Sequence, residues 1–318
     1  MVDKIMKKEK KKFLRKKISA FVLKILISVG AKFSAKAGLF IGGGLGVVAY
    51  YMLIRHRKVA MESLTMAFPE KSLSQRKKIA RECFIFLGQG FFDVLYFLDR
   101  ETEVKNNIRV NGEANLVQGL VKNRGAIILT AHLGNFPLIA LKLAKMGYTV
   151  NLVIRPMREK NADKYFHKLR DRGGVKTIKS YPRKECVSKI LKALKNNELV
   201  VLLMDQNFGT GGVWVKFFNM LAATPIGAVV LGLRTGTAIM PSYIYQEKAG
   251  RHCLRILPEF ELIKTENNDE TILLNVIKIS RLMEDWIREY VNQWTWIHRR
   301  WKSRPSKEIL NSKFKVEK

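Results

Sequence analysis

Acidic residues and cysteines are scarce in this sequence, and each shortage narrows what the protein can be. The 318 residues include 27 Asp or Glu against 58 Lys or Arg, which gives a formal net charge of +31. The three cysteines, Cys83, Cys186 and Cys253, are far apart and fit no metal-binding or redox spacing. We therefore expect a reduced compartment or packed free thiols, with no disulfide, no zinc and no metal among the site residues.

The sequence also lacks an internal repeat and, near its start, a compact apolar segment followed by a small-residue cleavage site. The second absence argues against a cleaved signal peptide. Because 47% of the residues are hydrophobic, the chain can bury the core of one large domain, or of one domain with an appendage.

A long apolar stretch, residues 37–54, stands between two basic segments. Residues 1–17 carry nine Lys or Arg, and Arg55-His56-Arg57-Lys58 follow the stretch directly. As a helix, the stretch would reach about 27 Å, close to the thickness of a bilayer core. We interpret residues 1–58 as a basic segment with a membrane-associating helix that either spans the membrane or lies on it. The alternative is a buried core helix, since short glycine-rich apolar runs also occur in soluble domains.

Residues 60–99 have a helical pattern that Pro69 interrupts and that restarts at Ser72. Six aromatic residues lie in its second part, at a spacing more typical of a buried core than of a cofactor site. The lining of an acyl-chain groove is the alternative. The six residues are Phe84, Phe86, Phe91, Phe92, Tyr96 and Phe97.

Short apolar runs alternate with amphipathic helical patterns over the rest of the chain, which predicts a mixed, largely parallel α/β sheet flanked by helices. His132, Arg155 and Asp205 each stand where one of these runs ends. In a parallel sheet they would share one edge, where function is usually found. The predicted strands are 127–130, 149–154, 175–178, 198–204, 238–245 and 253–262, and the predicted helices are one ending at 146 and those at 161–172, 184–195 and 271–292.

Five motifs occur together in a characteristic order and spacing. They are TAHLGNF (130–136), MDQNFG (204–209), WVKFF (214–218), ATPIG (223–227) and WIHRRWKSRP (296–305). As a set they resemble the bacterial lipid A biosynthesis (lauroyl/myristoyl) acyltransferase family, of the lysophospholipid acyltransferase-like superfamily, over residues 35–305. The resemblance implies an acyltransferase-like α/β domain at 59–305, followed by a basic tail at 306–318.

The resemblance further implies an enzyme on the cytoplasmic face of the bacterial inner membrane, acting in lipopolysaccharide synthesis. It would transfer a fatty acyl group to a hydroxyl of a lipid A precursor or another anionic glycolipid. The donor would be a thioester on acyl carrier protein or coenzyme A; it is a substrate, so no cofactor is expected. His132 would be the general base, because an imidazole that titrates near neutrality suits this task. The partners are thus donor, glycolipid and membrane, with no nucleic acid.

Substrate-binding residues can be expected on the same grounds. Backbone amides around Gly134 and Asn135, at the start of a helix, would stabilise the thioester oxyanion. Arg155 would hold a phosphate or a sugar acid of the acceptor, a plain surface charge being the alternative. Gln206 and Thr224, which belong to two of the motifs, would also contact substrate.

One residue departs from the family pattern, which places an aspartate or glutamate five positions after the histidine. Pro137 occupies that position, so the carboxylate is absent. Proline suits the first turn of a helix, so the backbone can keep its path. Asp205 from a neighbouring strand end is our preferred replacement, although an aspartate there can also cap a turn. Otherwise His132 works with only a backbone carbonyl or water, or the chain is a non-catalytic lipid-binding relative.

Two basic regions remain. Residues 296–305 are aromatic and basic, which fits stacking on nucleic acid or anchoring at a membrane interface. The apolar stretch at 37–54 favours the anchor, with His298 contacting carbonyls or lipid headgroups. Residues 155–195 contain fourteen Lys or Arg and four acids. That charge would suit an acidic carrier protein or anionic headgroups, the alternative being an ordinary solvated face.

Overall fold

All five residues of β2 (Ala126–Thr130) are buried, and successive side chains enter cores on opposite sides of one sheet. Ile127 and Leu129 pack into one core, whereas Ala126 and Ile128 pack into the other. A strand that is buried on both faces needs apolar residues at nearly every position, which explains the uninterrupted apolar run in the sequence.

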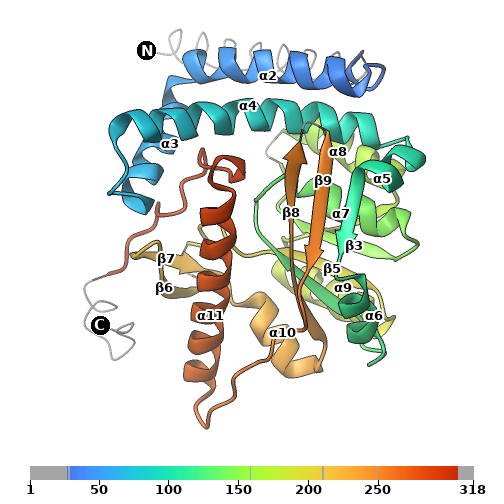
Figure 1. Ribbon diagram of the computed structural model, residues 1–318. Helices are drawn as coiled ribbons and strands as arrows, with labels where there is room; N and C mark the ends of the chain where they lie inside the picture. Colours follow the sequence, from blue (N-terminus) through green and yellow to red (C-terminus); the bar gives the residue numbers. More distant parts are fainter. Residues whose placement is uncertain (1–26, 28, 158, 210, 249, 307–318) are drawn as a thin grey trace, which may run out of the picture.

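The computed structural model (Figure 1) describes residues 27, 29–157, 159–209, 211–248 and 250–306. Besides β2, the main sheet contains β1 (Ile108–Asn111), β3 (Val150–Ile154), β4 (Val175–Lys179), β5 (Leu199–Leu203), β8 (Ala238–Lys248) and β9 (Arg251–Ile256). Their order in space is β1-β9-β8-β2-β5-β3-β4. The last five in this order run parallel, whereas β9 and β1 run the opposite way. The predicted mixed, largely parallel α/β fold is confirmed.

Helices cover both faces of this sheet, and a small hairpin flanks it. One face is packed by α5 (Glu101–Asn107), α6 (Glu113–Leu120), α7 (Pro137–Lys145) and α8 (Lys160–Arg172). The other is packed by α9 (Arg183–Lys195), α10 (Gly227–Thr235) and α11 (Asn268–Glu289), which the short helical turn η1 (Val291–Gln293) follows. The antiparallel hairpin of β6 (Val213–Phe217) and β7 (Met220–Thr224) packs against α11.

Among the strands that the sequence predicted, the largest difference is at residues 253–262. The run at 253–262 was expected to be a strand throughout, but β9 ends at Ile256, shortly before Pro258, which has no amide hydrogen to donate. The strands predicted at 149–154, 175–178 and 198–204 match β3, β4 and β5 to within a residue at each end. The sequence patterns did not predict β1, α5, α6, α10 or the hairpin.

Two helices follow the N-terminal region, α3 (Ile54–Ala67) and α4 (Leu73–Phe97). Residue 58, where we expected the N-terminal segment to end, lies inside α3. Ser72 caps α4, because its Oγ accepts the Gln75 amide at 3.2 Å while Gln75 Oε1 accepts the Ser72 amide at 2.7 Å. This is the predicted restart. The aromatic residues Phe84, Phe86, Phe92 and Phe97 are buried, as expected for a core.

The apolar N-terminal helix, α2 (Ala35–Met52), lies along α4 so closely that the two backbones touch. A Cβ atom on Gly42 would lie 2.5 Å from the carbonyl oxygen of Gly88 in α4, and Gly46 lies just as tightly against the Phe84 carbonyl. Only glycine fits at this contact. Gly44, between the two, faces open space.

The other face of α2 is apolar and exposed, with Phe40 85% exposed. Among the described residues, α2 is the one helix long and apolar enough to cross a membrane. The predicted stretch at 37–54 is divided at Leu53, which separates α2 from α3. Residues 1–26 and 307–318, and with them the basic N-terminus and nearly all of the predicted tail, lie outside the described residues.

Candidate active site

The carboxyl edge of the parallel strands brings together the residues that the sequence placed there. His132 follows β2, Asp205 follows β5 and Arg155 follows β3. β2 and β5 are parallel neighbours, and β3 pairs with β5 on its other side. His132 and Asp205 therefore stand at the ends of adjacent strands. Neighbouring strands in a sheet are about 4.8 Å apart. Arg155 stands one strand further along.

Asp205 holds the His132 turn through two contacts. Its Oδ1 lies 2.8 Å from Nδ1 of the imidazole, and its Oδ2 accepts the backbone N–H of His132 at 2.9 Å. The predicted approach of Asp205 to His132 is thus confirmed as geometry. When the carboxylate accepts a hydrogen bond from a protonated Nδ1, the lone pair of the neutral imidazole is on Nε2. The His132 side chain is 20% exposed, so the ring can be reached from solvent.

Asp205 is 1% exposed and yet held in its charged form. Burial acts to raise its pKa, but the charge and hydrogen bonds of His132 and a hydrogen bond from Trp294 outweigh burial and bring the pKa down to about 2. Trp294 Nε1 donates to Oδ2 at 2.7 Å. A carboxylate fixed by these donors keeps the imidazole in one orientation and one tautomer.

A segment near the C-terminus crosses the His132 turn. Leu133 and Trp294 form an antiparallel bridge. The carbonyl oxygen of His132 accepts two hydrogen bonds from Thr295, at 3.2 Å from the amide and at 3.0 Å from the hydroxyl. Sequence reasoning missed these contacts, because 89 residues separate Trp294 from Asp205 and no local pattern joins them.

Gly134 has a conformational role in this turn. Its φ is +60°, and a Cβ atom would collide with the carbonyl oxygen of Ile244, so only glycine fits. Its N–H donates to the Gln293 carbonyl at 3.0 Å. That bond occupies one of the two amides that we expected to stabilise an oxyanion. The backbone N–H of Asn135 finds no acceptor among the described residues, so it is the available donor of the pair.

The side chain of Asn135 is turned away from the surface. It is buried, and its Nδ2 donates to the carbonyl oxygen of Gly90 in α4 at 3.0 Å. The amide therefore ties the His132 turn to α4. We had expected Asn135 to contact substrate, and in this arrangement only its backbone can do so.

The other expected substrate contacts lie in different surroundings. Arg155 is exposed and has no hydrogen-bond or ionic partner in the described part of the chain. Gln206 is half-buried next to Asp205. Thr224 is buried, and its hydroxyl donates to the Ala222 carbonyl at 3.1 Å. The position of Thr224 suits a structural contact better than a substrate contact.

Arg300 is a buried cation that the sequence did not single out. Its guanidinium donates to the Ala223 carbonyl at 2.6 Å, to the Gln206 carbonyl at 3.4 Å and to the Thr224 hydroxyl. It also lies 4.9 Å from the centroid of the Phe217 ring. Burial lowers its pKa to about 10. Arg300 thereby joins the loop that begins at Asp205 to the β6–β7 hairpin.

His298 belongs to the same surroundings. Its Nδ1 is buried and has no partner among the described residues. Burial lowers the pKa of His298 to about 4; the charge of Asp205 opposes this shift, and His132 and Arg300 add to it. We expected His298 to contact carbonyls or lipid headgroups; in the structure it is largely buried, and burial is the main cause of its lowered pKa.

The tryptophans near the C-terminus belong to the core. Trp294, Trp296 and Trp301 are all buried, and the first two meet edge to face with ring centroids 4.5 Å apart. The interpretation of residues 296–305 as a membrane anchor is therefore wrong. The rings of Trp296 and Trp301 pack against Phe218 and Phe217 of the β6–β7 hairpin rather than against lipid.

Pro137 is the first residue of α7, as expected for proline at a helix start. The preceding residue, Phe136, lies edge-on to His132 with ring centroids 4.7 Å apart. An aromatic ring therefore lies beside the imidazole, and Nδ1 of the imidazole is taken by Asp205.

No group of three or more His, Cys, Asp or Glu side chains that could hold a metal ion occurs in the described ranges. The three cysteines are buried and free. Burial raises the pKa of Cys83 to about 12, and its thiol donates to the Trp294 carbonyl at 3.2 Å. A thiol in this state is a poor nucleophile.

Comparison with known proteins finds one matching family and relatives that cover most of the chain. The family model described as bacterial lipid A biosynthesis acyltransferase matches residues 6–303. A lipid A biosynthesis palmitoleoyltransferase of Escherichia coli (strain K12) is 26% identical over 273 residues, 84% of this chain and 85% of that protein. The lipid A biosynthesis lauroyltransferase of the same strain is 24% identical over 268 residues, 83% of this chain and 85% of that protein. The crystal structure of a 1-acyl-sn-glycerophosphate acyltransferase from Thermotoga maritima covers 76% of this chain and 96% of its own, with 13% identity and a TM-score of 0.35, which adds nothing to the fold described above.

Proposed function

Because the chain belongs to the bacterial lipid A biosynthesis acyltransferase family, we propose that it transfers a fatty acyl group from a thioester to a hydroxyl of a lipid A precursor or a related glycolipid. The donor is acyl carrier protein or coenzyme A carrying the acyl chain. The observation that carries the proposal is the bond between His132 and Asp205. It gives the imidazole a charged partner although Pro137 has replaced the acid of the family pattern.

In this mechanism His132 acts as the general base. Its Nε2 removes the proton from the acceptor hydroxyl while the hydroxyl oxygen attacks the thioester carbonyl carbon. The ionised Asp205 stabilises the imidazolium that forms. General-base assistance of this kind is worth about 10²–10⁴ in rate.

The tetrahedral intermediate carries negative charge on the former carbonyl oxygen, and the backbone N–H of Asn135 is the donor that supports this oxygen. The intermediate collapses as the carbon–sulfur bond breaks. The departing sulfur takes the proton back from Nε2, so the products are an ester and a thiol, and His132 is again neutral. No cofactor takes part.

Arg155 is suited to hold the acceptor. A guanidinium binds phosphate with two parallel hydrogen bonds, and Arg155 is exposed without a partner among the described residues. It stands at the same sheet edge as His132, so a phosphorylated glycolipid bound there would present its sugar near the base.

The exposed face of α2 would rest in the cytoplasmic leaflet of the inner membrane. α2 and α4 lie across the end of the sheet toward which β8 points (Figure 1). The contact of Gly42 with Gly88 occupies the inner face of α2, which favours a helix that lies on the membrane over one that crosses it. A lipid acceptor in that leaflet would then be close to the carboxyl edge.

The test is acyl transfer by the purified full-length protein in detergent, with lauroyl acyl carrier protein and a lipid A precursor. We expect His132→Ala to lower turnover at least about 10²-fold, the lower end of the benefit from general-base assistance. His167→Ala is the matched control, because His167 also pairs with an aspartate, Asp171, at 2.7 Å, but on the exposed surface of α8. Equal turnover by the parent and His132→Ala would refute the assignment. A parent without turnover that still binds the glycolipid saturably would support a lipid-binding relative.

A further inference from the structure

The basic residues of α9 have no acidic partners among the described residues. All five are exposed, and none lies within ion-pair distance of a carboxylate in the described parts of the chain. The helix itself contains a single acid, Glu185. The five are Arg183, Lys184, Lys189, Lys192 and Lys195.

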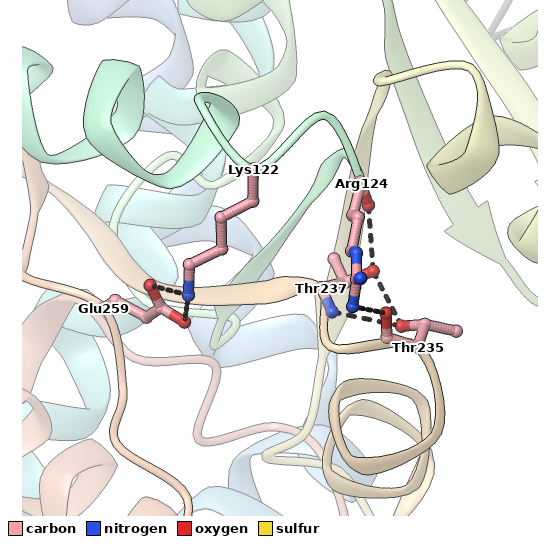
Figure 2. A network of polar contacts seen from close by, with 5 residues as sticks. All are labelled: Lys122, Arg124, Thr235, Thr237 and Glu259. Carbon is pink, nitrogen blue, oxygen red and sulfur yellow. Dashed lines mark hydrogen bonds and ion pairs between the residues drawn. The ribbon is translucent and has the colours of Figure 1, made fainter.

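Some exposed cations near the sheet are paired with acids. Lys176 at the start of β4 lies 3.0 Å from Glu198, and Lys122 lies 2.6 Å from Glu259. Figure 2 shows the Lys122 pair beside a hydrogen-bonded group around Arg124, at the amino ends of β2 and β8. On α9, by contrast, five exposed cations without an acidic partner in the described part of the chain lie on one 13-residue helix.

The same helix exposes apolar side chains. Val187 and Leu191 are each 41% exposed and lie one turn apart, so they share a face. Lys184 and Lys195 continue that face by one turn in each direction. Tyr181, just before the helix, is 74% exposed. This face, which we call the α9 strip, thus has an apolar centre between lysines.

The α9 strip begins at the active-site edge. α9 follows β4 at the carboxyl ends of the strands. Arg183, its first residue, lies 5.6 Å from the ring centroid of Phe208, in the loop that starts at Asp205. From there the helix extends for about 20 Å at 1.5 Å per residue.

We propose that the α9 strip docks an acidic protein that carries the acyl thioester. The inference rests on the proposed function, which requires such a donor. Unpaired lysines attract an acidic surface over a long range, and the exposed Val187 and Leu191 give a protein partner apolar contact that phosphate groups do not need. The membrane is the less suitable occupant, because α9 runs from the carboxyl edge of the sheet back toward the amino edge, away from α2 (Figure 1).

The first test measures binding of lauroyl acyl carrier protein to the full-length protein in detergent. We expect Lys184→Glu/Lys195→Glu to weaken binding at least about tenfold, as for other close charge pairs across interfaces. Arg234→Glu/Lys264→Glu is the control, because it makes the same change in net charge at two exposed cations outside the strip. It should leave binding nearly unchanged. Equal affinity of parent and strip variant would overturn the proposal.

The second test compares lauroyl acyl carrier protein with lauroyl coenzyme A as donors. The strip variant should raise KM for the protein donor only and leave kcat unchanged. If KM rises for coenzyme A while carrier binding is intact, the strip holds nucleotide phosphates and the proposal is wrong. If the variant instead loses binding to phosphatidylglycerol vesicles alone, the strip meets the membrane and the proposal is equally wrong. A parent that turns over neither donor would refute the proposed function, whereas the binding measurement would still decide the docking surface.

Discussion

Nδ1 of His132 and Oδ1 of Asp205 lie 2.8 Å apart, although 73 residues separate the two in the sequence. The contact follows from the sheet, because β2 and β5 are parallel neighbours whose last residues, Thr130 and Leu203, are in register. His132 has Pro137 at the position where the family pattern has an acid. It can nevertheless have a charged partner, Asp205, which the neighbouring strand supplies.

Replacing Asp205 with asparagine should reduce kcat strongly. The substitution keeps the shape of the side chain but removes the charge that supports the imidazolium, and its amide can donate to Nδ1 and so favour the wrong tautomer. We expect a loss of about 10³–10⁴ in kcat, the scale seen when the corresponding charge is removed from a serine-protease triad. KM should change little. Steady-state kinetics with a thermal unfolding control would measure the effect, and a loss below tenfold would mean that Asp205 is not the partner.

Restoring the acid of the family pattern should add little. In Pro137→Glu the new carboxylate stands in the first turn of α7, where a negative charge is tolerated well. Because Nδ1 of His132 is already occupied by Asp205, we expect turnover close to that of the parent. The double variant Pro137→Glu/Asp205→Asn should recover part of the activity lost in Asp205→Asn. Turnover that appears only when Glu is present at 137 would show that the acid had been lost without replacement.

His298 should make the fold less stable in mild acid. Its pKa in the folded protein is about 4, below the ordinary 6.5, so the unfolded chain takes up the proton first as the pH falls. The folded state therefore loses stability between pH 6.5 and about 4, by on the order of 1–3 kcal/mol, with no further loss from this group below that. Urea unfolding in detergent at pH 7 and pH 4.5 would compare the parent with His298→Gln. We expect the variant to lose less stability on acidification, and identical losses would contradict the assignment.

The glycine contact between α2 and α4 should be sensitive to one methyl group. Gly42→Ala places a Cβ 2.5 Å from the Gly88 carbonyl oxygen, so the helices must move apart. We expect the free energy of unfolding to fall by about 1–3 kcal/mol, as for other overpacked sites. Gly44→Ala meets open space and should be neutral or stabilising by up to about 1 kcal/mol, because alanine favours the helix. Chemical unfolding of both variants in one detergent would measure the difference, and equal stabilities would show that the close contact is absent in solution.

Local sequence patterns were sufficient to predict the elements that depend only on residues close together in the chain. The apolar run at β2 and the cap at Ser72 depend on residues within a few positions, so both could be predicted from the sequence. β1 could not, because Ile108–Asn111 alternates polar and apolar residues over only four positions and becomes a strand by pairing with β9, far along the chain.

The active site shows the same division. The sharing of one edge by His132, Arg155 and Asp205 follows from parallel strands, which the sequence pattern predicts. The contribution of Trp294 does not follow from any pattern. A segment that mixes aromatic and basic residues looks the same in sequence whether its rings are buried in the core or bound to a membrane. Its burial depends on the β6–β7 hairpin, whose packing no local pattern specifies.

The bond from Trp294 to Asp205 also has a consequence for the order in which the protein is made. Synthesis proceeds from the N-terminus, so α2, with its apolar face, leaves the ribosome first. The Trp294 donor to Asp205 and the Thr295 groups that hold the His132 turn follow only after every strand of the main sheet. A chain that terminates before them retains the apolar helix and the histidine but lacks the residues that orient the pair. If α2 binds the membrane as proposed, such incomplete products would occupy it without reacting there.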